Sequence, residues 1–187
     1  PSILPTKEIE PIFSPLVSLG REVGASSWSI DNLFISPQGY LTIVETKLWR
    51  NPEARRQVVG QIIEYAKEVS TWTFDDLDQK VKERITDESG KQLGVIDTIR
   101  HANIEIKEEN ESDLIDSITK NMQSGRFLLL IVGDGIREST EELAEYLSRS
   151  PQTHFTLALV ELKIYDAGNG WLVIPQVVSR TREITRA

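Results

Sequence analysis

A chain of 187 residues with 39% hydrophobic and 27% charged side chains is typical of one soluble globular domain with its own core. Its net charge of −8 argues against a protein that coats nucleic acid non-specifically. No apolar run approaches the roughly 20 residues of a membrane span. The absence of cysteine excludes disulfides, thiolate zinc sites and cysteine nucleophiles, and it fits a reducing cytoplasm. We therefore expect a cytoplasmic protein without a membrane partner.

The first third of the chain predicts strands followed by a helix. Residues 16–23 (LVSLGREV) favour a first strand. Residues 30–47 (IDNLFISPQGYLTIVETK) hold two apolar runs around a Ser-Pro-Gln-Gly turn, which predicts a β-hairpin because glycine tolerates positive φ. Asn51 and Pro52 suit the cap and first position of a helix. Its apolar face would be formed by Val58, Ile62, Tyr65, Ala66 and Val69.

The middle of the chain, residues 73–124, predicts a mostly helical insert within the same domain. One helix is indicated by the helical spacing of Phe74, Leu77, Val81 and Ile85. The acidic run 107–111 is either a solvated helix start or a loop. A further amphipathic helix after it is indicated by Leu114, Ile115, Ile118 and Met122.

The last third predicts strands around one more helix. Residues 127–132 (FLLLIV) are typical of a strand covered on both faces. Residues 139–142 (STEE) resemble a capping box that opens a helix ending near residue 149. Residues 155–165 and 171–178 form two strands around a glycine-containing turn. The whole pattern predicts an α/β fold, with a mixed central β-sheet flanked by helices.

Three charged residues occupy the ends of the predicted hairpin strands. Asp31 and Glu45 lie on neighbouring strands across the turn, and Glu45 and Lys47 share a face because strand side chains alternate. Two carboxylates that converge in this way suit Mg²⁺ (or Mn²⁺), with the backbone carbonyl of Thr46 as a further oxygen ligand. Charges in an otherwise apolar strand are costly unless they have a use, and a metal site supplies one.

A local basic region follows this group in an acidic chain. Residues 47–67 hold five basic side chains against two acidic ones, Glu53 and Glu64, which is a surplus of +3. Three of the basic residues, Arg50, Arg55 and Arg56, stand at the start of the predicted helix. We expect them to grip phosphates of a nucleic acid, and Trp49 beside them is a further contact candidate.

The order Ile30-Asp31, Glu45-Thr46-Lys47 and then Gln61-xxx-Tyr65 resembles the PD-(D/E)xK, or restriction-endonuclease-like, nuclease superfamily. Residues 43–66 (IVETKLWRNPEARRQVVGQIIEYA) are similar to RecB-like nucleases, to uncharacterised bacterial nuclease-like proteins and, more distantly, to NucS-type domains. The resemblance covers residues 16–67, and Ile30 replaces the usual proline.

The resemblance implies metal-dependent hydrolysis of nucleic-acid phosphodiesters, with DNA as the expected substrate. Asp31, Glu45 and Thr46 would hold the metal, and Lys47 would orient the attacking water or stabilise the developing charge. Gln61 and Tyr65 would position DNA or the catalytic groups. Glu22 would complete the acidic set, although a salt bridge with Arg21 or Arg50 is an equal alternative.

Several alternatives stay open at this stage. Glu161 and Lys163 form a second ExK pattern, which we interpret as a surface pair along a sheet edge because no basic helix follows it. Asp31 could cap a turn while Glu45 and Lys47 form a simple ion pair. The scaffold could also be a non-catalytic module for defence, repair or a mobile element, binding nucleic acid or a partner protein. Pairing of two copies into a homodimer is a further alternative.

Overall fold

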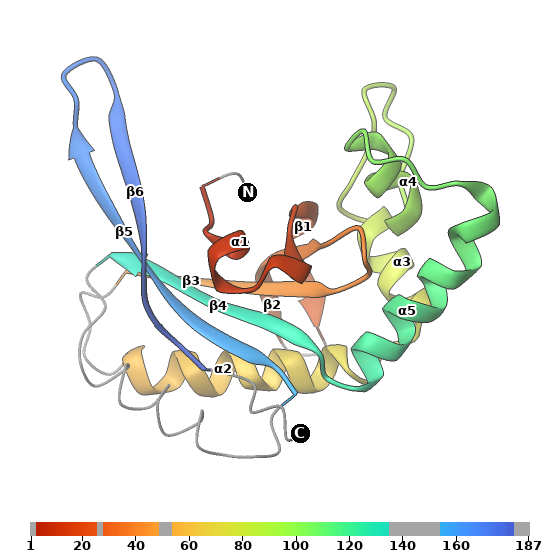
Figure 1. Cartoon of the computed structure of the whole chain (residues 1–187), viewed down its shortest axis with the longest axis horizontal. Helices are drawn as coiled ribbons and strands as arrows, with labels where there is room; N and C mark the ends of the chain where they lie inside the picture. The colour runs from red at the N-terminus through yellow and green to blue at the C-terminus, as the bar shows by residue number, and fades with distance from the viewer. Residues whose placement is uncertain (1–2, 26–27, 49–53, 135–153, 182–187) are drawn as a thin grey trace.

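The computed structural model describes residues 3–25, 28–48, 54–134 and 154–181 (Figure 1). Their elements begin with the short helix α1 (Thr6–Ile9) and the 3-10 turn η1 (Pro11–Phe13). Strands β1 (Val17–Ala25), β2 (Trp28–Ile35) and β3 (Leu41–Leu48) follow, and helix α2 (Ala54–Val69) comes next. The predicted hairpin and the helix after it are confirmed over these ranges.

The segment between α2 and the next strand is mostly helical, as predicted. It contains α3 (Phe74–Lys82), α4 (Val95–His101), η2 (Glu108–Asn110) and α5 (Glu111–Gln123). The chain then forms β4 (Phe127–Asp134), β5 (Thr156–Asp166) and β6 (Trp171–Arg180). The helix predicted after residue 139 lies outside the described residues.

The described strands form one six-stranded sheet in the order β1-β2-β3-β4-β5-β6. β2 pairs antiparallel with both β1 and β3, while β3, β4 and β5 run parallel to one another and β6 returns antiparallel to β5. The sheet is therefore mixed, and helices flank it, which confirms the predicted α/β class. No helix in the described ranges has both the length and the apolar content that a membrane crossing needs.

Each face of the sheet packs against a separate apolar cluster. α2 lies along one face and α1 along the other (Figure 1). Along β3, Leu41 and Ile43 belong to the larger cluster on the α2 side, whereas Val44 belongs to the smaller cluster with Ile9 and Phe13. The alternation of β3 side chains therefore places odd-numbered residues toward α2. This parity decides where Glu45 and Lys47 point.

The turn between β2 and β3 uses the glycine that its sequence predicts. Gly39 has a φ of 81°, and a Cβ atom built there would lie 2.9 Å from Ile118 Cγ1 on α5. Its carbonyl accepts a hydrogen bond of 3.1 Å from Asn121 Nδ2. Helix α5 thus packs against the turn of the hairpin that carries the charged residues.

Candidate active site

Asp31 and Glu45 lie near each other where the pairing of β2 with β3 ends. The last pair of this ladder is Asn32 with Val44, and beyond it the Thr46 N–H donates to the Asp31 carboxylate instead of to a strand carbonyl. Burial is the main cause of a raised pKa at Glu45, and the charge of nearby Asp31 adds to the rise.

Thr46 holds the Asp31 carboxylate in place. Asp31 Oδ2 accepts a hydrogen bond of 2.8 Å from the Thr46 backbone N–H and one of 2.6 Å from Thr46 Oγ1. A strand residue directs its N–H and C=O to the same side, so the Thr46 carbonyl also faces the gap beside Asp31. The Asp31 carboxylate and this carbonyl therefore lie at the same strand end as Glu45.

Glu45 is a buried acid with one unpartnered oxygen. The residue is only 1% exposed, and its Oε1 forms a 2.8 Å ion pair with Lys47 Nζ. Its Oε2 is buried and has no hydrogen-bond partner. Burial is the main cause that raises the pKa of Glu45; the hydrogen bond from Lys47 acts in the opposite direction, and nearby Asp31 adds to the rise. The ion pair alone leaves the carboxylate under-satisfied.

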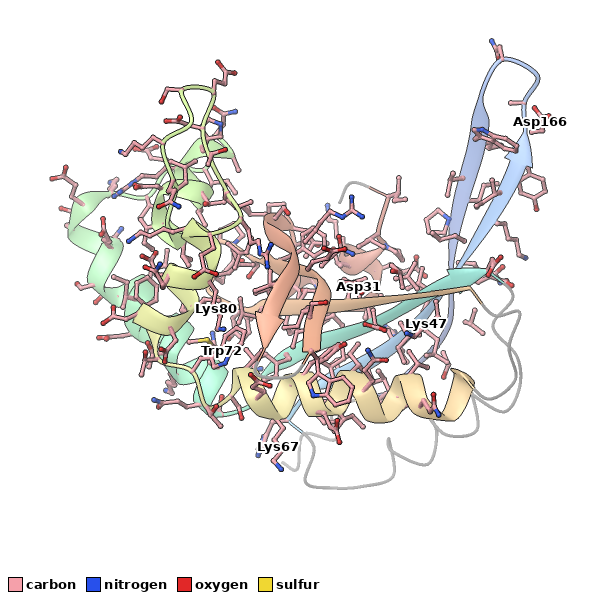
Figure 2. The ribbon with its side chains drawn as sticks, turned by 180° about the vertical axis from the view of Figure 1, so that it is seen from behind. Asp31, Lys47, Lys67, Trp72, Lys80 and Asp166 are labelled. Carbon is pink, nitrogen blue, oxygen red and sulfur yellow. The ribbon has the colours of Figure 1, made fainter. Side chains whose placement is uncertain are left out.

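Lys47 links this buried acid to solvent. Its side chain is 32% exposed, and the hydrogen bond with Glu45 is the main cause that raises the pKa of its ammonium group. Figure 2 shows Asp31 on β2 and Lys47 on β3, with Lys47 on the side of β3 that faces α2. Lys47 therefore carries a positive charge at the opening of the site over the whole neutral pH range.

Helix α2 contributes Gln61 and Tyr65, one turn apart. Gln61 Nε2 donates a short hydrogen bond to Tyr65 Oη, and Tyr65 is 1% exposed. Burial is the main cause that raises the pKa of the Tyr65 phenol; the charges of Glu45 and Asp31 add to the rise, and the charge of Lys47 acts against it. The pair thus lies within electrostatic reach of all three charged residues. Because Tyr65 is buried, it packs beneath the site as part of α2 and offers little surface to a nucleic acid.

Glu22 is not brought into this group. The β1–β2 register sets it across from Asp31, between the pairs Arg21–Asn32 and Val23–Ile30, but its φ is 51° and its side chain is exposed. Within the described ranges, no three carboxylate or imidazole side chains gather closely enough to hold a metal ion. A metal bound here would therefore rely on two carboxylates and backbone or water oxygens.

The predicted nucleic-acid contacts lie beyond what the structure describes. Trp49 and Arg50 are outside the described residues, and so are the side chains of Arg55 and Arg56 at the start of α2. The helix that carries the two arginines does follow β3 directly in the chain. Their contact with a nucleic acid stays a prediction.

The second ExK pattern has different surroundings. Glu161 and Lys163 stand on β5 with 4.0 Å between Oε2 and Nζ, and the Lys163 side chain is 45% exposed. They are a surface pair, as interpreted from the sequence, although β5 is an inner strand because β6 pairs beyond it. Neither residue is buried, so this pair provides a matched comparison for Glu45 and Lys47.

The role of the Thr46 side chain was missed by sequence reasoning, which considered only its carbonyl. A threonine beside a buried acid at a strand end is the one local signal that could have suggested it. Comparisons with known proteins leave this geometry as the basis for a functional assignment: no protein-family model, no curated protein and no solved structure matches the chain.

Proposed function

We propose that this chain is a divalent-metal-dependent nuclease with a restriction-endonuclease-like fold, acting on the phosphodiester bonds of DNA. The observation that carries the proposal is the buried Glu45 oxygen without a partner, near the charge of Asp31 and beside Lys47. An unsatisfied carboxylate oxygen in the interior costs free energy unless a ligand uses it. A hard cation is the ligand that this donor set fits.

The ligand atoms of the site decide which cation fits it. Glu45 Oε2, the Asp31 carboxylate and the Thr46 carbonyl are oxygen atoms, which Mg²⁺ and Mn²⁺ prefer, and the site contains no sulfur or imidazole. With so few protein donors, a bound cation would keep several waters. Such a cation, when bound, lowers the pKa of a bound water and neutralises charge on the scissile phosphate.

The chain's own residues would each do a defined part of the work. Glu45 and Asp31 would bind the cation, and Thr46 fixes the orientation of Asp31. Lys47 has an ammonium group at the opening of the site, where it would stabilise negative charge that builds on the phosphate. Gln61 and Tyr65 are positioning residues that support this face from α2.

Cleavage assays on the purified chain test the proposal directly. Duplex DNA, single-stranded DNA and RNA are incubated with Mg²⁺ or Mn²⁺, and with a chelator as the blank. We expect metal-dependent cleavage of DNA, which Asp31→Asn, Glu45→Gln and Lys47→Ala each reduce by roughly 100-fold or more. Glu161→Gln, in the second ExK pattern, is the matched control and should keep wild-type activity.

Two outcomes would overturn the proposal. Absence of cleavage on all three substrates, together with Mn²⁺ binding that depends on Glu45, would favour a non-catalytic module that uses the same site. Cleavage that Glu45→Gln leaves unchanged would place the activity elsewhere or in a contaminant. Thermal unfolding of each variant, compared with wild type, separates loss of the site from loss of the fold.

A further inference from the structure

The outer part of the β5–β6 hairpin stands away from the rest of the structure, with Asp166 at its tip (Figures 1 and 2). This arm exposes large apolar side chains that a monomer would normally bury. Among them Trp171 is 73% exposed, and the others are Ile164, Tyr165, Leu172 and Ile174. The strand register divides them between the two faces of the hairpin, and so much exposed apolar surface on one hairpin indicates an interaction site.

The arm also presents a free and uncharged strand edge. β6 is the last strand in the sheet order, so no described strand pairs with its outer side. Residues 171–178 (WLVIPQVV) contain no charged residue. Exposed edge strands usually carry charges that prevent pairing with another chain, and this one has none until Arg180.

The position of proline defines which backbone groups face outward. Pro175 pairs with Leu162, and since proline has no N–H, this pair is of the kind that exchanges no hydrogen bonds. The alternation then turns the backbone groups of Trp171 and Val173 to the outer side as well. The turn gives the same alternation: the Ala167 N–H donates to the Gly170 carbonyl, so the next pair, Asp166 with Trp171, exchanges no hydrogen bonds. The outer edge therefore offers two N–H groups and three carbonyls between Trp171 and Pro175.

We propose that a second copy of this chain adds its own β6 to this edge, antiparallel, around a twofold axis at Val173. In that register the two Val173 residues exchange a pair of hydrogen bonds. Each Trp171 N–H donates to the carbonyl of Pro175 in the second copy. Proline, which has no N–H to donate, therefore stands only at the two ends of the ladder. This arrangement satisfies the four outward N–H groups of the two strands.

The side chains in this register match one another without charge conflict. Trp171 lies opposite Pro175 of the second copy, and Leu172 lies opposite Ile174 of the second copy, so apolar groups meet throughout. A nucleic acid is a poor occupant, because the cation on the outer arm, Lys163, stands beside Glu161. Self-complementarity is the property that a twofold interface requires.

The size of the arm sets the strength that we expect. Its five large apolar side chains expose on the order of 500 Å² together, against roughly 800 Å² per partner in a standard interface. The pairing is therefore reversible, with a dimer fraction that rises with protein concentration. It does not depend on the proposed nuclease activity.

Disulfide trapping tests the register, because the chain has no cysteine of its own. Two copies of V173C meet at the axis within the range that a disulfide bridges. The control N169C, at the hairpin tip, would hold its thiols roughly 25 Å apart in the same dimer. We expect oxidation to link V173C into a dimer at least ten times faster than N169C. Equal rates would overturn the proposal.

Sedimentation velocity over a concentration series tests the dimer without cross-linking. Wild type should dimerise, and V173P should weaken the dimer by tenfold or more, because proline removes an outward N–H that the β5–β6 ladder does not use. As a control, V173P should keep the melting temperature of the wild type, which would show that the fold is retained. A wild type that is monomeric throughout would overturn the proposal, in favour of another protein or another segment of this chain on the arm. A dimer that V173P leaves unchanged would also overturn it, since the interface would lie elsewhere.

Discussion

Asp31 and Thr46 are joined by two hydrogen bonds to a single carboxylate oxygen, one from the Thr46 backbone N–H and one from its hydroxyl. The backbone bond survives any substitution except proline, whereas the hydroxyl bond belongs to the side chain. Thr46 thus orients one of the two acids while its neighbour in the chain, Glu45, is the other. The two proposed ligands are therefore coupled through Thr46, and a substitution of this residue tests the coupling.

Replacing Thr46 by valine should lower cation affinity and cleavage without unfolding the chain. Valine keeps the β-branched shape and the backbone N–H, so only the 2.6 Å hydroxyl bond is lost. Loss of such a supporting contact reduces metal affinity by about 10–100-fold. Calorimetric titration with Mn²⁺ measures the effect. Thr46→Ser is the matched control, and an equal loss in both variants would show that the hydroxyl is irrelevant.

Glu45 should make the metal-free chain less stable as the pH rises. Its pKa is raised in the folded state from an ordinary value of 4.5, so between these two values the folded chain binds more protons than the unfolded one. The free energy of unfolding therefore falls as the pH rises through this window. Urea unfolding in a chelator, over a pH series from 4 upward, measures the slope. Glu45→Gln should lack this contribution; parallel curves for the two proteins would contradict the assignment.

Removing the Lys47 charge should destabilise the chain because it leaves the buried Glu45 carboxylate without its ion-pair partner. We expect Lys47→Met to cost about 1–3 kcal/mol at neutral pH, less than the ~3–5 kcal/mol of a fully buried pair, since Lys47 is 32% exposed. Glu45→Gln combined with Lys47→Met should recover most of the loss. Chemical denaturation of the two single variants and the double variant gives the coupling energy. Additive effects would mean that the 2.8 Å ion pair contributes nothing.

Periodicity controls the part of this geometry that the sequence could predict. Alternation along β3 placed Glu45 and Lys47 on one face, and the spacing of Gln61 and Tyr65 placed them one turn apart on α2. Both relationships depend on a few neighbouring residues in one element. For the same reason the strands and the longer helices were predicted with boundaries close to those observed.

Other features depend on contacts between distant segments and could not be predicted. Helix α4 starts at Val95, whose N–H donates to Asp78 Oδ1 on α3 at 2.7 Å, so its cap comes from 17 residues earlier. The N-cap residue Gly94 has no side chain that could bond the first N–H groups of the helix. The sequence of β1 predicts regular alternation at Glu22, but its backbone has a φ of 51° and its side chain is exposed to solvent.

The capping box of α3 offers a test of the fold that is independent of the site. Thr73 and Asp76 bond each other reciprocally, which satisfies two backbone N–H groups. Thr73→Ala should lower the free energy of unfolding by about 1 kcal/mol. Gln79→Ala on the same helix is the control and should have little effect. Equal stability of the two variants would contradict this start of α3.

The same box predicts a second pH dependence of opposite sign. Hydrogen bonds from the Thr73 backbone and hydroxyl lower the pKa of Asp76 below its ordinary value of 3.8. The stabilisation is therefore complete above that value and is lost as the pH falls through the folded pKa. The pKa of Asp76, followed by NMR titration, should move back toward 3.8 in Thr73→Ala. An unchanged pKa would contradict this cause.

The central claim is that Asp31 and Glu45 bind one divalent cation on the face of β3 that is turned toward α2. Crystals soaked in Mn²⁺ and measured for anomalous scattering test it most directly. The account predicts an anomalous peak bonded to a carboxylate oxygen of each acid, with Glu45 Oε2 among the ligands. A saturating soak with no peak between these two side chains, or with its only peak elsewhere on the protein, would contradict it.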